Sequence, residues 1–127
     1  MNLSVRFVTI DCADPYALAQ FWSQAFGTGM NPDDLPGDAE ASVIIGDGEP
    51  ELLFNQVPEG KHAKNRMHLD FEPDQPREEA VARLLELGAT EIGDFRRDDG
   101  SGWWVLADPE GNEFCVLVSA AKRAQLD

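Results

Sequence analysis

The sequence predicts an α+β domain, and three observations lead to this fold class. Alternating apolar stretches typical of β-strands occur with only two stretches of helical spacing. A strand, a helix begun by Asp, a Gly stop and a hairpin follow one another, and this order occurs twice. The matched positions lie 60 or 61 residues apart: Asp14 and Asp74, Gly27 and Gly88, Asp47 and Asp108. A chain of 127 residues is long enough for one domain with a real core.

The first copy begins with a strand predicted over residues 5–11, where β-branched side chains alternate with polar ones. Asp14 and Pro15 then start a helix, because Asp caps free amides and Pro presets the first turn. Apolar side chains at helical spacing continue to Phe26, and Gly27 ends the helix. Residues 31–40, with two Pro and several acids, predict a loop.

Two strands and a linker complete the first copy. Strands over residues 41–45 and 51–57 are joined by the turn Gly46-Asp47-Gly48. A polar, partly basic linker covers residues 58–65. The prediction is then a repeat of this arrangement from residue 66 onward.

The second copy opens with a strand over residues 66–72 and a helix from Pro76 to Gly88. The remaining elements are a short edge strand, a charged loop, two hairpin strands and a frayed tail, over residues 91–95, 96–102, 103–107, 112–119 and 120–127. The hairpin turns at Asp108-Pro109-Glu110-Gly111, a strong turn signal. These ranges contain seven strands, and two complete copies of the unit give the expected total of eight strands and two helices, with the helices on one side of the sheets.

Charge and cysteine content exclude several functions. The net charge is −14, and ten acids but no Lys or Arg lie between Arg6 and Lys61. Such an anionic surface disfavours nucleic acid and anionic lipid and attracts cationic small molecules, although solubility alone also explains it. No apolar stretch approaches a membrane span and no signal peptide is recognisable, so we expect a cytoplasmic protein. Cys12 and Cys115 are too few for a disulfide framework.

Several motifs resemble the vicinal oxygen chelate superfamily. The resemblance extends over nearly the whole chain and rests on residues 8–14, Phe21-Trp22, His68-Leu69-Asp70-Phe71, Leu87-Gly88-Ala89 and the run from Leu106 to Asn112. This superfamily includes glyoxalase I, extradiol dioxygenases, fosfomycin-modifying thiol transferases and bleomycin-binding resistance proteins, and the chain is most similar to its small glyoxalase-like branch. The resemblance implies two βαβββ modules, about residues 1–57 and 66–119 of a single domain 1–127. Their curled mixed sheets would enclose a cavity, and the protein would form a homodimer.

Enzymes of this superfamily commonly hold a divalent metal through His, Gln and Glu side chains on four strands. Carried over by motif, the resemblance places Phe7, Glu51, His68 and Cys115 at those positions. A phenyl ring cannot donate to a metal, so we expect no tightly bound metal, and no cofactor is predicted. Glu51, His68 and Cys115 could still hold Zn²⁺ with an open position. A register shift of two residues would bring Glu113 into the site.

Alternation adds further residues to the cavity side of the strands: Thr9, Asp11, Asp70 and Glu72. His68 beside Asp70 is a candidate catalytic acid/base, because a carboxylate can orient an imidazole. Trp103 could form an aromatic wall for a cationic ligand, whereas core packing is the ordinary role for Trp103 and Trp104.

Two functions remain open. The first is a metal-independent binding protein that sequesters a cationic aromatic compound, with Phe7, Glu51, His68, Asp70, Trp103 and Cys115 as the ligand-binding residues. The second is a lyase, isomerase or dioxygenase that uses a divalent metal or His68 and Asp70. A superfamily that supports several chemistries does not decide between them.

Overall fold

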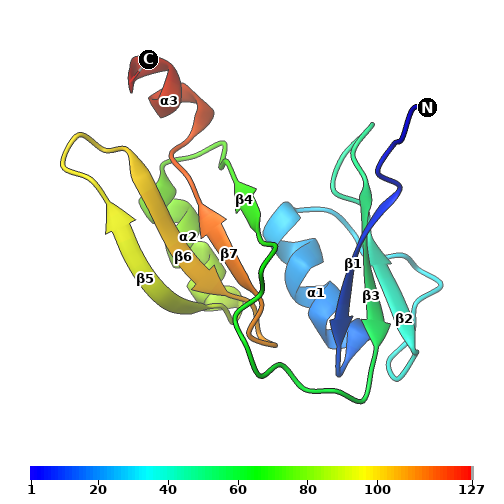
Figure 1. Ribbon diagram of the computed structural model, residues 1–127. Helices are drawn as coiled ribbons and strands as arrows, with labels where there is room; N and C mark the ends of the chain where they lie inside the picture. Colours follow the sequence, from blue (N-terminus) through cyan, green and yellow to red (C-terminus); the bar gives the residue numbers. More distant parts are fainter. Residues whose placement is uncertain (127) are drawn as a thin grey trace. The chain divides into compact units, whose positions relative to one another are not determined.

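The computed structural model describes residues 1–126, and the chain forms two compact units. The first unit is Met1–Lys61 and the second begins at His62. Each unit contains a sheet with a helix against one of its faces (Figure 1). The α+β class predicted from the sequence is therefore confirmed. None of the helices in residues 1–126 has the length and apolarity needed to cross a membrane.

The first unit is a three-stranded sheet with one helix. Its elements in chain order are β1 (Phe7–Cys12), α1 (Pro15–Phe26), β2 (Glu40–Val43) and β3 (Glu51–Gln56). β3 is the central strand, parallel to β1 and antiparallel to β2. The core lies between the sheet and α1, where Leu18, Phe21, Trp22, Leu52 and Phe54 are all buried.

The ends of α1 follow the local sequence signals. The Ala17 amide donates to the Asp14 carboxylate at 3.2 Å, which is the predicted N-cap. Gly27 ends the helix in the left-handed conformation, with φ +72°, as a C-terminal Gly commonly does. Both predictions are confirmed, and the broad apolar stripe between them is the face that packs on the sheet.

The second unit has a four-stranded sheet and two helices. Its elements are β4 (Leu69–Phe71), α2 (Arg77–Leu87), β5 (Thr90–Arg96), β6 (Gly102–Ala107), β7 (Glu113–Val116) and α3 (Ala120–Leu126). The strand order is β4-β7-β6-β5, with only the β4–β7 pair parallel. Leu106, Phe114 and Val116 are buried on the face that α2 covers, together with Val81 of that helix.

A buried arginine fastens α2 to the hairpin of β5 and β6. The Arg77 guanidinium donates to the Gly102 and Gly100 carbonyl oxygens at 2.9 and 3.0 Å, and only 5% of the residue is exposed. Gly102 has φ +88°, and a Cβ there would lie 2.3 Å from the Phe95 carbonyl oxygen. Only glycine therefore allows the backbone to pass so close at this point.

Three details differ from the sequence predictions. Residues 1–126 contain seven strands instead of eight. The first unit lacks a strand at the positions that match β5 of the second unit, where Met30 forms only an isolated bridge to Val43. The tail predicted to fray is helix α3, which is tied to the sheet by an ion pair between Arg123 and Glu72 at 2.6 Å. The strand predicted over residues 66–72 is shortened to Leu69–Phe71.

Candidate functional site

Each sheet has one face covered by a helix and one face that its own unit leaves open. In the first unit Phe7 and Glu51 are register partners on neighbouring strands. In the second unit Asp70 pairs with Cys115, and Cys115 pairs with Val105. Because side chains alternate along a strand, the predicted site residues of each unit share one face, opposite the buried core residues. We call the face of the β4-β7-β6-β5 sheet opposite α2 the helix-free face.

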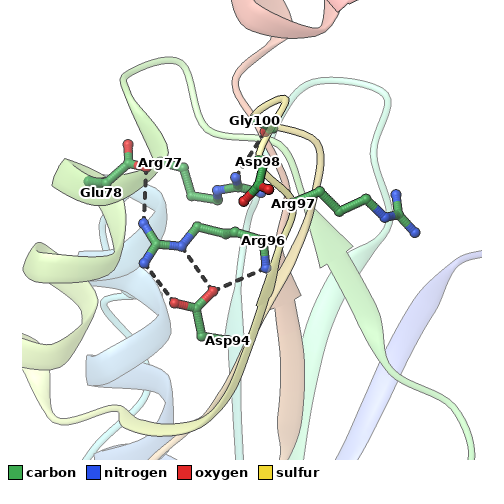
Figure 2. Close-up of a pocket in the computed structure, with 7 residues that line it drawn as sticks. All are labelled: Arg77, Glu78, Asp94, Arg96, Arg97, Asp98 and Gly100. Carbon is green, nitrogen blue, oxygen red and sulfur yellow. Dashed lines mark hydrogen bonds and ion pairs between the residues drawn. The ribbon is translucent and has the colours of Figure 1, made fainter.

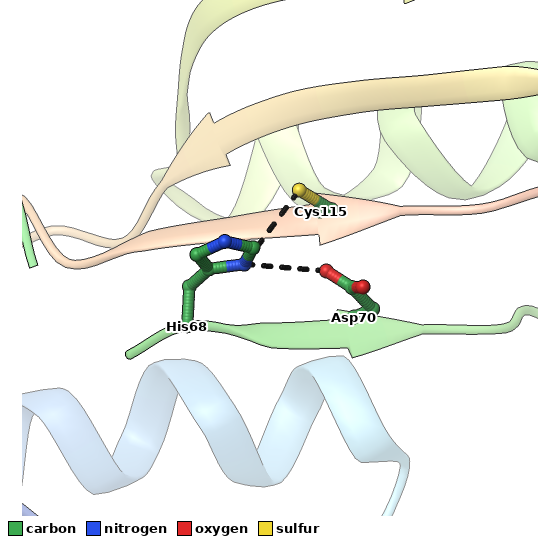
Figure 3. A group of neighbouring side chains, drawn as sticks. All are labelled: His68, Asp70 and Cys115. Carbon is green, nitrogen blue, oxygen red and sulfur yellow. Dashed lines mark hydrogen bonds and ion pairs between the residues drawn. The ribbon is translucent and has the colours of Figure 1, made fainter. Parts of the chain in front are cut away.

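Three polar side chains meet on the helix-free face (Figure 3). His68 Nδ1 lies 3.3 Å from Asp70 Oδ1 and 4.0 Å from Cys115 Sγ. Their potential ligand atoms all lie within 4.8 Å of one another. His68 comes directly before β4 and Asp70 is in its middle, whereas Cys115 is on the adjoining strand β7. The structure thus brings three of the predicted site residues together on one face, and their role in binding stays a prediction.

The Cys115 thiol is a poor nucleophile in this environment. Burial raises its pKa to about 11, and the neighbouring Asp70 carboxylate contributes in the same direction because it disfavours a second negative charge. A thiol with so high a pKa stays protonated at neutral pH. The trio also lacks the geometry of a Cys-His-Asp relay, since Asp70 and Cys115 both approach the same imidazole nitrogen.

The geometry leaves the other nitrogen of His68 for a ligand. A proton on Nδ1 that points to Asp70 leaves a lone pair on Nε2. About a third of the His68 side chain is exposed to solvent. His68 can therefore accept a proton or a hydrogen bond from a bound molecule through Nε2.

A pair of aromatic rings lies on the same face, on the second and third strands from Asp70. Phe95 and Trp103 are cross-strand partners whose rings stack at 5.7 Å between centroids and 25° between planes. A Cβ on Gly93 would lie 2.7 Å from the Phe95 ring, so that ring extends over the bare backbone of Gly93. More than a third of each aromatic residue is exposed. We call Phe95 and Trp103 the aromatic platform.

The two neighbouring tryptophans have different surroundings. Trp104 lies on the α2 side of the sheet, where the Arg96 guanidinium is 3.9 Å from its ring centroid. The Arg97 guanidinium is 5.3 Å from the ring centroid of Trp103. The register therefore places Trp103 on the open side, where an aromatic wall was predicted, and Trp104 on the side that packs against the helix.

The first unit carries the other predicted site residues. Phe7 is 38% exposed, and the Arg6 guanidinium lies 4.8 Å from its ring centroid. Thr9 and Asp11 follow Phe7 at alternate positions and are exposed on the open face of this sheet. Cys12, by contrast, is buried against the α1 side. The ligand-binding role of Phe7 and Glu51 stays a prediction.

Sequence reasoning missed Phe95 and Gly93 as site residues. The sequence contains a signal for Phe95, because side chains alternate along β5 and its partner strand β6 contains Trp103. The prediction of a short edge strand at residues 91–95 did not use that signal. Glu113 is on β7 beside the trio, and its carboxylate accepts a hydrogen bond from the Asn65 amide at 3.2 Å. That bond engages the carboxylate in fixing the segment that leads into β4.

A separate pocket of about 370 Å³ lies outside the helix-free face. It is lined by Arg77, Glu78, Asp94, Arg96, Arg97, Asp98 and Gly100 (Figure 2). Its central cation, Arg96, donates to both Asp94 oxygens and pairs with Glu78 at 3.3 Å. This pairing lowers the pKa of Asp94 to about 2. Internal carboxylates therefore already satisfy Arg96, and the pocket contains none of the predicted site residues.

The metal implied by the family resemblance can be tested on the donor set. His68, Asp70 and Cys115 offer one nitrogen, one oxygen and one sulfur, a mixture that Zn²⁺ accepts. Around a tetrahedral Zn²⁺ such atoms lie roughly 3.3–3.8 Å apart, so a spread of up to 4.8 Å requires the side chains to draw inward. The thiol would also have to lose its proton. The trio thus fits Zn²⁺ in ligand type and only loosely in geometry.

Comparisons with known proteins agree with this geometry. The family model of the Glyoxalase-like domain matches residues 7–117. A hypothetical protein from S. aureus, SA1046, is 19% identical with a TM-score of 0.69, over 93% of this chain and 95% of that chain. A glyoxalase/bleomycin resistance protein/dioxygenase family enzyme from Burkholderia phytofirmans is 21% identical with a TM-score of 0.66, over 88% and 95%.

A third similar structure is a possible glyoxalase from Bacillus cereus, 22% identical with a TM-score of 0.64, over 91% of this chain and 99% of that chain. A search of curated proteins found no significant match. At these identities the solved structures show a shared fold, and the family match covers most of the chain.

Proposed function

This chain belongs to the glyoxalase-like domain family of the vicinal oxygen chelate superfamily, and from that premise we propose that it binds a cationic aromatic small molecule. The ligand would be held on the helix-free face of the second unit without a metal ion. Sequestration of the compound, rather than its conversion, would be the function. The family match supports a small-molecule protein but does not specify the ligand.

The observation that carries the proposal is the aromatic platform on a face that also bears carboxylates. The rings of Phe95 and Trp103 are already stacked on each other, so their relative orientation is fixed before a planar ligand arrives. The Asp70 carboxylate lies on the same face with half of its side chain exposed, whereas the Glu72 carboxylate is already paired with Arg123. Ring faces and carboxylates both favour a positive charge, and the net charge of −14 attracts cations from a distance.

The trio supports binding without a metal. The raised pKa of Cys115 keeps its thiol neutral, and a neutral thiol is a poor ligand for Zn²⁺. Elemental analysis of the purified protein should find no stoichiometric transition metal, and one zinc ion per chain would contradict this part of the proposal.

A matched pair of probes tests the ligand class. N-methylquinolinium and quinoline have nearly the same shape at neutral pH, and only the first is a cation. We expect the cation to bind more tightly in calorimetry and Trp103→Ala to weaken it by about 1 kcal/mol or more. Leu85→Ala, an exposed apolar truncation on α2, is the control. Equal affinity of Trp103→Ala and the parent protein would remove Trp103 from the site.

The proposal includes a homodimer and a cytoplasmic location. Each sheet ends in strands whose outer edges need cover, and twofold dimers are the commonest oligomers. Light scattering should give twice the chain mass of 14.0 kDa, and a monomer at micromolar concentration would contradict the dimer. Neither Cys12 nor Cys115 is in a disulfide, which suits a reducing compartment and which fractionation of the native host would check.

A second candidate function is an enzyme that uses His68. The contact between His68 and Asp70 supports it, because the carboxylate orients the ring and leaves Nε2 to take a proton from a substrate and return it to another atom. Such a transfer is the core of an isomerase or lyase. A zinc ion, if His68, Asp70 and Cys115 held one, would polarise a substrate oxygen.

Replacing His68 separates the two functions. If the protein only binds, His68→Gln should change affinity for N-methylquinolinium modestly and no turnover should be detected with either protein. If it is an enzyme, turnover of a carbonyl substrate should be measurable in the parent protein and should fall 100-fold or more in His68→Gln. Turnover of that size would replace the binding proposal.

A further inference from the structure

We propose that Arg97 is an internal cation that guards the ring of Trp103, so that an external cation must displace it before stacking there. This inference rests on the proposed function and concerns the selectivity of the same site. Its guanidinium carbon lies 5.3 Å from the ring centroid of Trp103, within the range of a cation–π contact. A cationic ligand on that ring would need the same position.

Arg97 is placed on this side of the sheet by strand alternation. It follows Phe95 by two residues, and its amide donates to the Ser101 carbonyl oxygen at 2.9 Å, which continues the hairpin. Its side chain extends away from the group formed by Arg77, Glu78 and Arg96 (Figure 2). Arg96, one position earlier, contacts Trp104 on the opposite face.

Few contacts hold Arg97 where it is. Its one side-chain hydrogen bond among those described is to Ser101 Oγ at 3.5 Å, at the limit of a hydrogen bond. The exposed carboxylate of Asp99 also attracts Arg97, and Arg97 itself is exposed. Arg96, in contrast, is held by Asp94 and Glu78. Arg97 can therefore swing into water at small cost, and the guard is a weak one that a suitable ligand can displace.

The need to displace Arg97 makes the site selective among aromatic ligands. A neutral aromatic molecule can stack beside Arg97 without competing for its position, whereas a cation meets both competition and repulsion from it. Only a cation whose attraction to the carboxylates and rings exceeds that of Arg97 would enter. The residue thus sets the threshold at which cationic ligands are accepted.

The test compares Arg97→Gln with Arg83→Gln, which removes the same charge from an exposed position on α2. We expect Arg97→Gln to bind N-methylquinolinium about threefold more tightly or better. Arg83→Gln should leave that affinity nearly unchanged, and neither variant should alter binding of quinoline. Unchanged or weaker binding of the cation by Arg97→Gln would overturn the inference.

A second measurement needs no bound ligand. Caesium ions quench the fluorescence of exposed tryptophan. The part of this quenching that is due to Trp103 is the part that is lost in Trp103→Phe. That part should increase in Arg97→Gln by more than quenching by neutral acrylamide does, and neither should change in Arg83→Gln. If N-methylquinolinium binds none of the variants, the proposed function is wrong. The caesium measurement then tests by itself whether Arg97 shields Trp103, and no increase in quenching by caesium in Arg97→Gln would refute that inference.

Discussion

The helices of the two units cover their sheets to very different extents. In the first unit α1 buries Leu18, Phe21 and Trp22 against the sheet, whereas in the second unit α2 buries only Ala80, Val81 and Arg77. The open faces differ in the opposite sense. The first carries Phe7 and Glu51, and the second carries an imidazole, a thiol, two carboxylates and stacked aromatic rings.

This difference shows how a repeated unit can divide its tasks. The order of strands and helix in each unit depends on the packing of the helix-covered face, where different apolar side chains can fill the core. The open faces do not contribute to that packing and are free to differ. Substitutions at matched positions, 60 or 61 residues apart, therefore test which of these positions have the same structural role in both units.

The largest expected effect is at a matched pair where the units agree. Phe54 and Phe114, 60 residues apart, are 0% and 2% exposed in the two cores. Replacing either one with Ala should lower the free energy of unfolding by about 3–5 kcal/mol, measured by chemical denaturation. Phe54→Leu and Phe114→Leu are milder controls. A loss below about 1 kcal/mol in one unit would show that its core is not packed as described.

A large difference is expected at the two hairpin turns. Asp108 is buried, and its carboxylate accepts bonds from the Glu110 and Asn112 amides and the Asn112 side chain. Asp47, its partner in the repeat, is exposed. Asp108→Ala should lower stability by about 2 kcal/mol or more, because three donors lose their acceptor, and Asp47→Ala by less than about 0.5 kcal/mol.

Thermal unfolding of the two variants side by side would check this difference. Asp108→Asn, which keeps one side-chain oxygen, should fall between Asp108→Ala and the parent protein. Equal losses at positions 47 and 108 would mean that the two turns are built alike after all.

A smaller difference is expected at the helix starts. The Asp14 carboxylate caps α1, whereas α2 begins after Pro76 with no side-chain cap, so Asp74 does not repeat the role of Asp14. Asp14→Ala should cost about 1 kcal/mol and Asp14→Ser should restore most of it. Asp74→Ala should be nearly neutral in the same denaturation experiment. A clear loss in Asp74→Ala would indicate a cap at the second helix.

The last prediction concerns the thiol of the second unit. In a Cys12→Ser background, thiolate absorbance should report a Cys115 pKa of about 11, and Asp70→Asn should lower it. Because the folded state raises this pKa, its contribution to stability is present below about pH 9 and is lost as the pH rises toward 11. A thiol that titrates near its ordinary value would show that Cys115 is more accessible than described.

The sequence predicted the fold because its signals were local and repeated. The cap at Asp14, the stop at Gly27 and the turn at Asp108 each specify a boundary from neighbouring residues. Neighbouring residues did not predict that Met30 forms a single bridge instead of a strand, or that the tail forms helix α3. Met30 pairs with Val43 alone, and α3 is held by the contact of Arg123 with Glu72, 51 positions away.

The site was predictable where alternation alone decides which face a residue occupies. The family resemblance supplied His68 and Cys115, alternation added Asp70, and the structure places the three side chains near one another on the face that also carries Trp103. Phe95 was missed because its position depends on which strand pairs with β6 and on the space above Gly93. Spatial neighbours of that kind are not written in the periodicity of a single strand.

The empty space above Gly93 links two positions in the history of this sequence. While the Phe95 ring keeps its present position, a Cβ at position 93 would lie 2.7 Å from it, so a side chain there would force the ring to move off the platform. A change at position 95 that removes the ring would also remove this conflict. Relatives should therefore show glycine at the first position wherever the second is aromatic, and a collection in which the two vary independently would contradict this link.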